Sequence, residues 1–318
     1  MSAPAWVDKA QAQTRLAFGL AITDMAGRDD RIVAISADTL DLIGLRDFAA
    51  RFPERLIDVG IAEQNAMGVA SGLATTGLRP FVCGYAPFIT ARSMEQLRND
   101  VAYADQRVVI GAAASGISLG VAGGTHHAVE DIALMRSLPN MTVVVPADVH
   151  QAWHATRATD DIDGPVYLRL GGRVAEPAVT PLAGPFRLGR ADLLNEGNDV
   201  TVIACGALVA PAVAAAETLG RDGIAARVLN MATVKPLDRE AVLAAAAETR
   251  GIVTAEEHHL TGGLGGAVAE LLAQEHPARM RMIGLGDEFA CVGPTDRIRA
   301  KYGMSAGHIV AACRALLD

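Results

Sequence analysis

Aromatic residues are scarce in this sequence and make up 4% of its 318 residues. An aromatic side chain near a strand end or a glycine-rich loop is therefore informative about a binding site. The chain also lacks a run of Lys and Arg, and its net charge is −8. Because nucleic acids and anionic membranes attract clustered positive charge, we expect neither as a partner.

Cysteine is also rare. The cysteines lie far apart and form no CxxC pair: Cys83, Cys205, Cys291 and Cys313. This spacing argues against a zinc site and favours a reducing compartment. No apolar run approaches the ~18 residues of a membrane span, and the N-terminal stretch MSAPAWVDKAQ has acid and amide residues where a signal peptide needs an apolar core. We therefore predict a soluble, cytoplasmic protein.

Several catalytic motifs are missing as well. No GxSxG, P-loop or HExxH pattern occurs, and no Rossmann glycine fingerprint follows the first predicted strand. The chemistry must therefore be sought in other groups of residues.

What the sequence does contain is an alternation of short β-branched runs with Ala-rich amphipathic stretches. This alternation is typical of crossover units around mainly parallel sheets, so we predict an α/β fold with two open sheets. The expected strands are 31–38, 79–85, 107–113, 141–148, 165–170, 199–206, 224–231 and 251–257. The expected helices are 9–27, 92–104, 150–160, 211–220, 238–249 and 265–274.

The length favours two domains. Three prolines and the loss of periodicity mark residues 173–188 as a linker. We therefore predict domains at 1–172 and 189–318.

Glu63 is an acidic residue on the apolar face of a predicted helix. Helical spacing places it in line with Met67, Ala70 and Ala74. A carboxyl group among apolar neighbours has a raised pKa and suits proton transfer. An acid that caps the helix N-terminus is the structural alternative.

Two other segments hold candidate site residues. Tyr85 and Phe88 lie at a strand end, where open α/β sheets bind ligands, although core packing explains them equally well. Arg92 lies one helical turn further along and could either bind an anion or form an ion pair at the surface. The glycine-rich string GGTHH ends in His126 and His127, which suit substrate contact or helix capping better than metal binding. We interpret the later string EEHHLTGGLGG as a tight strand-to-helix turn rather than a phosphate site.

The order and spacing of these segments resemble the transketolase family, whose members use thiamine diphosphate. The strings DVGIAEQNAMGVASGLATTGLRPFVCGYAPFI, GGTHH, MRSLPNMTVVVPAD and GPVYLRLGG resemble its pyrimidine-binding domain. The strings VLNMATVKPLD and EEHHLTGGLGG resemble its C-terminal domain. The resemblance covers nearly the whole chain, from about residue 9 onward.

The resemblance implies roles for individual residues. Glu63 matches the glutamate that hydrogen-bonds the aminopyrimidine of the cofactor and so promotes proton loss from the thiazolium carbon. Phe88 matches the aromatic residue on the pyrimidine ring, with Tyr85 beside it, and His126 matches a histidine that contacts substrate. With Ile61 and Arg92, these residues form the cofactor and catalytic site that we predict.

One family motif is absent. The resemblance implies that diphosphate and its Mg²⁺ (or Ca²⁺) bind a GDG…N motif in a separate N-terminal domain, and the nearest string here is GDE at 286–288. We therefore expect a partner subunit that carries GDG…N and holds the metal, an α2β2 heterotetramer, and no activity from this chain alone.

Departures from the family pattern concern the substrate. Ala114, Leu42 and Gly172 stand where the resemblance implies a phosphate-clamping histidine, serine and arginine; Ala122 replaces an aspartate and Asn65 a histidine. The remaining basic candidates for substrate binding are Arg15, Arg169 and Arg173.

The function implied by the resemblance is transfer of a two-carbon ketol or acyl unit to an aldehyde or keto acceptor through a carbanion on thiamine diphosphate. Two alternatives stay open: the β subunit of a 2-oxo-acid or acetoin dehydrogenase, and a non-catalytic regulatory homologue.

Overall fold

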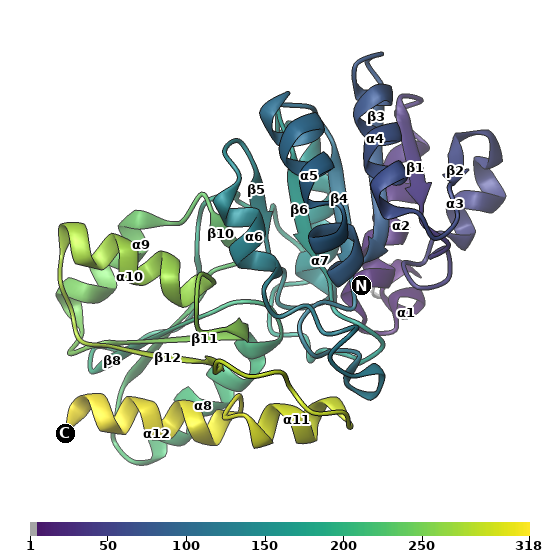
Figure 1. Cartoon of the computed structure of the whole chain (residues 1–318). Coiled ribbons are helices and arrows are strands. Elements are labelled where there is room, and N and C mark those ends of the chain that lie inside the picture. Colours follow the sequence, from purple (N-terminus) through teal and green to yellow (C-terminus); the bar gives the residue numbers. More distant parts are fainter. Residues whose placement is uncertain (1–4) are drawn as a thin grey trace.

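The computed structural model describes residues 5–318. It contains two α/β units, each built around one sheet (Figure 1). One sheet has seven strands and the other has five. Within each sheet the strands run parallel apart from one at an edge. The predicted fold class is confirmed.

The larger sheet has the strand order β10-β5-β6-β4-β3-β1-β2. Its strands are β1 (Ile32–Ser36), β2 (Leu56–Asp58), β3 (Arg79–Tyr85), β4 (Val109–Ala113), β5 (Thr142–Val144), β6 (Val166–Arg169) and β10 (Thr233–Lys235). Its helices are α1 (Ala5–Ala10), α2 (Thr14–Ala26), α3 (Arg46–Arg51), α4 (Glu63–Ala74), α5 (Met94–Gln96), α6 (Asp131–Ser137) and α7 (Val149–Ala158).

Inner strands of the larger sheet such as β1 and β4 are buried on both faces because helices cover both. On one face Ile35 and Val82 pack with Met67 of α4. On the other, Phe81 packs with Phe18 of α2. Gly111 on β4 is needed there, since an added Cβ would collide with the Phe18 ring.

The smaller sheet has the order β12-β11-β8-β9-β7. Its strands are β7 (Asp192–Asn195), β8 (Val200–Ala204), β9 (Ala226–Asn230), β11 (Ile252–His259) and β12 (Met280–Leu285). Its helices are α8 (Val209–Arg221), α9 (Arg239–Glu248), α10 (Leu264–Glu275), α11 (Thr295–Lys301) and α12 (Ala306–Leu317). Helices α11 and α12 run along one side of this sheet (Figure 1).

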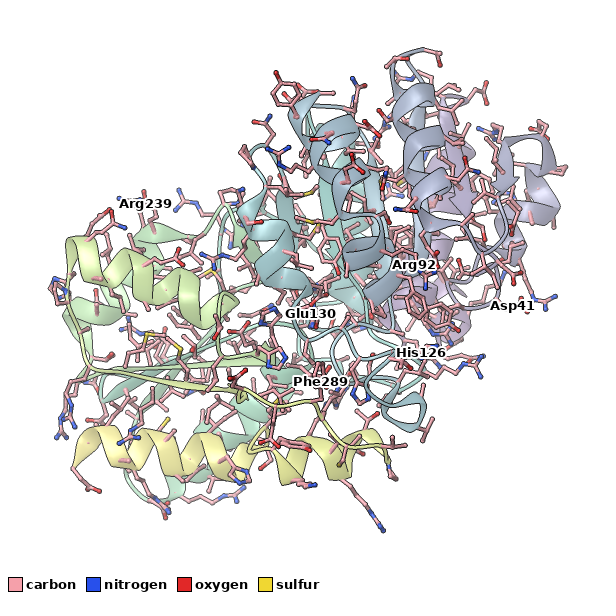
Figure 2. The ribbon with its side chains drawn as sticks, viewed as in Figure 1. Asp41, Arg92, His126, Glu130, Arg239 and Phe289 are labelled. Carbon is pink, nitrogen blue, oxygen red and sulfur yellow. The ribbon has the colours of Figure 1, made fainter. Side chains whose placement is uncertain are left out.

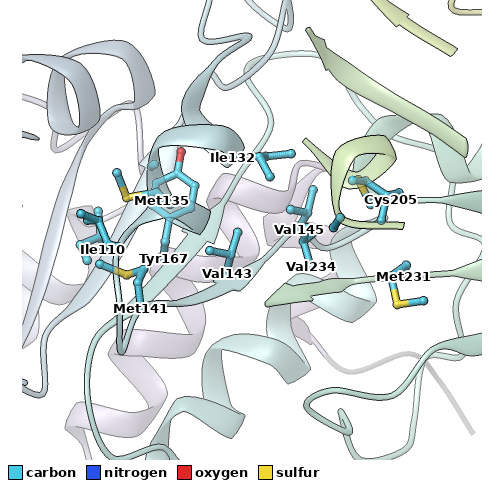
Figure 3. Packing of buried hydrophobic residues seen from close by; sticks show 14 of the residues in the cluster. Ile110, Ile132, Met135, Met141, Val143, Val145, Tyr167, Cys205, Met231 and Val234 are labelled. Carbon is cyan, nitrogen blue, oxygen red and sulfur yellow. The ribbon is translucent and has the colours of Figure 1, made fainter. Parts of the chain in front are cut away.

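The two halves share a continuous core. Strand β10, from the second half, pairs antiparallel with β5 at the edge of the larger sheet. Val234 of β10 joins Val143 and Val145 in one apolar cluster, which extends to Met231 and Cys205 (Figure 3). The halves are therefore joined by packing as well as by residues 173–188, which form neither helix nor strand. The exact domain boundaries stay a prediction.

Some elements differ from the sequence-based expectation. The helix predicted over 9–27 is two helices, because Gln11 and Ala12 adopt positive φ angles and the Ala12 carbonyl accepts a hydrogen bond from the Glu176 amide. The helical region predicted over 92–104 starts earlier than expected and includes π-helical turns at Phe88–Arg92 and Leu97–Tyr103. Strands β7, β10 and β12 and helices α11 and α12 were not predicted. Among residues 5–318, no helix combines the length and hydrophobicity needed to cross a bilayer.

Candidate active site

Glu63 is the first residue of α4 and is 3% exposed. The preceding turn is held by Asp58, whose carboxylate accepts the Gly60 amide at 2.8 Å. Arg92 donates to Glu63 Oε2 at 2.7 Å, and Oε1 has no donor within residues 5–318. The carboxylate accepts no amide of its own helix, so hydrogen-bonded capping does not explain its burial.

Tyr85, Phe88 and His126 form an edge-to-face aromatic cluster beside Glu63. Their ring centroids are 6.0 Å apart for Tyr85 and Phe88, 5.8 Å for Tyr85 and His126, and 5.2 Å for Phe88 and His126. The Arg92 guanidinium lies 4.5 Å from the Phe88 centroid and so links the cluster to the carboxylate. The π-helical turn Phe88–Arg92 presents both residues; such turns are frequent at functional sites.

The sheet topology explains why these residues meet. Glu63 follows β2, Tyr85 ends β3, and Phe88 and His126 follow β3 and β4. The carboxyl ends of parallel strands lie at one edge, where open α/β sheets bind ligands. Arg92 and His126 lie at that edge in Figure 2. Ile61, in the turn before Glu63, is 74% exposed.

His127, the next residue along the chain after His126, is 4% exposed. Neither ring nitrogen has a hydrogen-bond partner among the described residues. Burial lowers the pKa of His127, although the nearby Gly120 backbone and the negative charge of Glu257 oppose this effect. The fold therefore favours the neutral imidazole.

This burial predicts a pH dependence of stability. Because the unfolded chain protonates His127 near its ordinary pKa of about 6.5 and the fold resists protonation, the free energy of unfolding should fall as the pH drops below that value. The slope is at most about 1.4 kcal/mol per pH unit for one proton. Urea titrations between pH 5.5 and 7.5 should show a smaller slope for His127→Gln than for the parent. A matched His276→Gln variant changes an exposed histidine; equal slopes in both variants would contradict the prediction.

The arginine candidates differ in their surroundings. Arg15 is buried, and its guanidinium donates to the carbonyls of Gly172, at 3.0 Å, and Leu42. Burial, aided by Arg173, lowers its pKa. Arg169 is also buried and donates to Asp131 Oδ2 at 2.8 Å. Burial lowers the pKa of Arg169, but the Asp131 carboxylate more than offsets this effect and the net shift is upward.

Arg173, in contrast, is exposed. Because Arg15 and Arg169 direct hydrogen bonds into the fold, the geometry favours Arg173 for contact with a substrate anion. All three assignments remain predictions.

The EEHH string forms the end of β11 and does not offer a phosphate site. The Glu256 carboxylate accepts the amides of Leu264 and Gly265, both at 2.7 Å, and so occupies the N-terminus of α10. An added Cβ at Gly263 would collide with Glu256, which explains a glycine there. The interpretation as a strand-to-helix turn is confirmed. Across residues 5–318, no cluster of His, Cys, Asp or Glu could hold a metal ion.

Sequence reasoning missed how the second half contributes to the site. Glu257 and Thr295 contact the segment that leads to His126, and Arg299 holds the Glu257 carboxylate. The sequence signal for this contribution was Glu257, the second acid of EEHH. A charged residue on a strand that is predicted to be buried needs a partner inside the fold.

Comparison with known proteins gives the family. Residues 10–173 match the transketolase pyrimidine-binding domain, and residues 189–309 match the transketolase C-terminal domain. A 6-deoxy-6-sulfo-D-fructose transketolase subunit from a Clostridium species is 43% identical over 93% of this chain and 92% of its own length. The chain belongs to the transketolase family.

Other relatives of the transketolase family also match nearly the whole length of this chain. One subunit of an apulose-4-phosphate transketolase from Phocaeicola vulgatus is 41% identical over 96% of each chain. A split-gene transketolase solved as an inactive β4 tetramer is 43% identical, with a TM-score of 0.90 over 96% of this chain and 98% of that one. A 1-deoxy-D-xylulose-5-phosphate synthase from Geobacter sulfurreducens is 42% identical over 94% of this chain but 47% of its own length.

These relatives identify the chain as a transketolase-type transferase subunit that requires a partner subunit. Family membership implies dependence on thiamine diphosphate. The same evidence favours the transketolase hypothesis over the 2-oxo-acid dehydrogenase β subunit and over a regulatory homologue.

Proposed function

We propose that this chain supplies the ring-binding half of the thiamine diphosphate site in a split transketolase, and that Glu63 acts on the aminopyrimidine. The observation that carries the proposal is the buried Glu63 carboxylate beside the Phe88 ring, with Oε1 free of donors from residues 5–318. A partner with a GDG…N motif completes the site and holds the diphosphate and Mg²⁺ (or Ca²⁺).

The residues present fit the ring of this cofactor. Oε1 of Glu63 can make a hydrogen bond to a ring nitrogen, and Phe88 offers an aromatic surface for a heteroaromatic ring. Ile61 adds exposed apolar area next to Glu63. When bound, thiamine diphosphate supplies a carbon nucleophile that can accept a ketol or acyl unit.

The side chains of this chain then have distinct tasks. Glu63 exchanges a proton with the ring nitrogen, and Arg92 fixes its carboxylate by a charge-assisted hydrogen bond. His126, half-buried in the aromatic cluster, can donate to or accept from substrate oxygens. Tyr85 and Phe88 hold the imidazole of His126 in place.

For the substrate, we propose a ketose donor with an anionic end, and an aldehyde or keto acceptor. Two relatives are named for sugars that carry a sulfonate or a phosphate. Exposed Arg173 is the cation that would meet such a group, while Arg15 and Arg169 shape the surrounding backbone. An α2β2 assembly and a cytoplasmic location belong to the same proposal.

Phe88 should contribute to cofactor affinity. In the complex with the partner, Phe88→Ala removes the aromatic surface, and loss of about 1.4 kcal/mol of contact would weaken apparent thiamine diphosphate affinity about 10-fold. The measurement is activity against cofactor concentration. Tyr103→Ala removes an 87% exposed aromatic residue elsewhere and serves as the control. An unchanged cofactor requirement in Phe88→Ala would contradict this role.

A donor and acceptor screen tests the proposed reaction. The complex is reconstituted with thiamine diphosphate and Mg²⁺ and offered neutral, phosphorylated and sulfonated ketoses with a panel of aldehydes. We expect ketol transfer, with Arg173→Gln raising KM for anionic donors about 10-fold more than for neutral ones, since one charge-assisted contact is worth roughly 1.5–3 kcal/mol. Absence of ketol transfer from every donor would refute the proposed function.

A further inference from the structure

The segment 115–128, which we name the His126 loop, connects β4 to the region before α6. Its base is closed by paired backbone hydrogen bonds between Gly116 and Ala128, at 2.8 and 2.9 Å. The amides of His126 and His127 both donate to the Gly123 carbonyl. These bonds fix the shape of the loop but not its placement against the rest of the molecule.

The second half of the chain provides that placement. The Gly293 amide donates to the Gly120 carbonyl at 3.1 Å, and Thr295 Oγ1 donates to the Ile117 carbonyl at 3.2 Å. An added Cβ at Gly120 would collide with the Gly293 carbonyl and Ile298, so the two segments are in direct contact. The loop is thus supported by residues before and within α11.

Glu257 supports the base of the loop from β11. Its Oε2 lies so close to Gly116 that an added Cβ there would collide with the carboxylate, and Gly116 has a φ of +60°. Its Oε1 accepts from Arg299 Nε at 2.6 Å. Arg299 Nη2 also donates to Glu176 Oε1 at 3.1 Å. One arginine therefore holds two carboxylates from separate segments.

The three charged side chains of this group are almost completely buried. Glu257 is 3% exposed, Glu176 is 5% exposed and Arg299 is 9% exposed. Burial lowers the pKa of Arg299, but the Glu257 and Glu176 carboxylates outweigh that effect and raise it. Removing one charge from this buried group leaves its partners without a compensating charge. The stability of the group therefore depends on the planar guanidinium of Arg299, which can bind both carboxylates at once.

We infer that Arg299 and Glu257 are positioning residues for His126, so that the second half of the chain sets the substrate side of the active site. The inference rests on the proposed function of His126. Arg299 fixes Glu257, Glu257 contacts the Gly116 end of the loop, and the loop carries His126 to the aromatic cluster. Glu63 and Phe88 belong to other segments and do not depend on these contacts.

The test uses Arg299→Lys, which keeps the charge but cannot form the fork to both carboxylates. A small displacement of a catalytic group can lower activity about 100-fold; we expect kcat/KM for the ketol donor to fall about 10- to 100-fold in the complex with partner. The thiamine diphosphate concentration for half-maximal activity should stay within about 2-fold of the parent. Arg314→Lys, which alters an exposed ion pair with Asp222 in the same half, should match the parent.

A second measurement is independent of activity. Hydrogen exchange of the isolated chain should be at least ~10-fold faster in Arg299→Lys at the amides of Gly116, Ala128 and His126, with the α4 amides unchanged. If Arg299→Lys does not fold, Glu257→Gln, which removes the charge and keeps the shape, is measured in the same way. Parent-like exchange and kcat/KM in the folded variant, or an equal loss of cofactor affinity, would overturn the inference. An inactive parent complex would instead refute the proposed function.

Discussion

Replacing Glu63 by Gln is expected to lower kcat of the reconstituted complex about 10²- to 10⁴-fold, the range for loss of a proton-transferring group. Glutamine keeps the size of the side chain and can still accept the hydrogen bond from Arg92, but it cannot exchange a proton with the cofactor ring. Glu63 is 3% exposed, and its neighbours Met67 and Ala70 are fully buried. Because Glu63 is the one acidic residue of α4, the helix offers no substitute. Steady-state turnover at saturating cofactor measures the effect.

The control is Glu196→Gln, at an exposed carboxylate of the second half. Thermal unfolding and complex formation with the partner should be alike in both variants and the parent. Full turnover by the Glu63→Gln complex would disprove the role of Glu63. A loss of turnover that is matched by a loss of folding would show a structural role instead.

This chain alone should show no ketol transfer above the buffer background, and addition of the GDG…N partner should give full activity. The physical reason is the lack of a site for the charged end of the cofactor. Within residues 5–318 no side-chain cluster suits a metal ion, and the N-terminus of α10 is occupied by the Glu256 carboxylate.

Titration of the chain with its partner measures this requirement. Activity should rise with partner concentration and reach a plateau near equimolar subunits, in the presence of thiamine diphosphate and Mg²⁺. A partner variant with its GDG aspartate changed to asparagine should bind without restoring turnover. Turnover by the isolated chain would contradict the split-enzyme account.

The sequence predicts those parts of the site that depend on local order. Helical spacing alone places Glu63 among Met67 and Ala70, and the structure buries all three. Likewise the parallel strand pattern predicts that residues after β2, β3 and β4 meet at one edge, since parallel strands end together. The cluster of Tyr85, Phe88 and His126 follows from that rule.

Contacts between side chains and backbone could not be predicted in this way. Arg15 and Arg169 donate to carbonyl groups, which every residue carries, so no sequence pattern marks them as internal. The Arg92–Glu63 pair depends on a π-helical turn that residue spacing does not reveal.

The sequence analysis missed some helices and strands, and the reasons differ from one element to the next. Strand β10 has three residues and is stable only because Val234 packs into a core shared with the first half. Helix α12, in contrast, carries a clear apolar pattern at Ile309, Val310, Cys313 and Leu316, which would have permitted its prediction.

The most direct test of the central claim is the rate of hydrogen–deuterium exchange at the thiazolium carbon of thiamine diphosphate, measured by quench-flow NMR in the complex without substrate. Glu63→Gln should slow this exchange at least ~100-fold, and Glu196→Gln should leave it unchanged. Exchange at the parent rate in the Glu63→Gln complex would contradict the claim that this chain supplies the proton-transferring acid of the site.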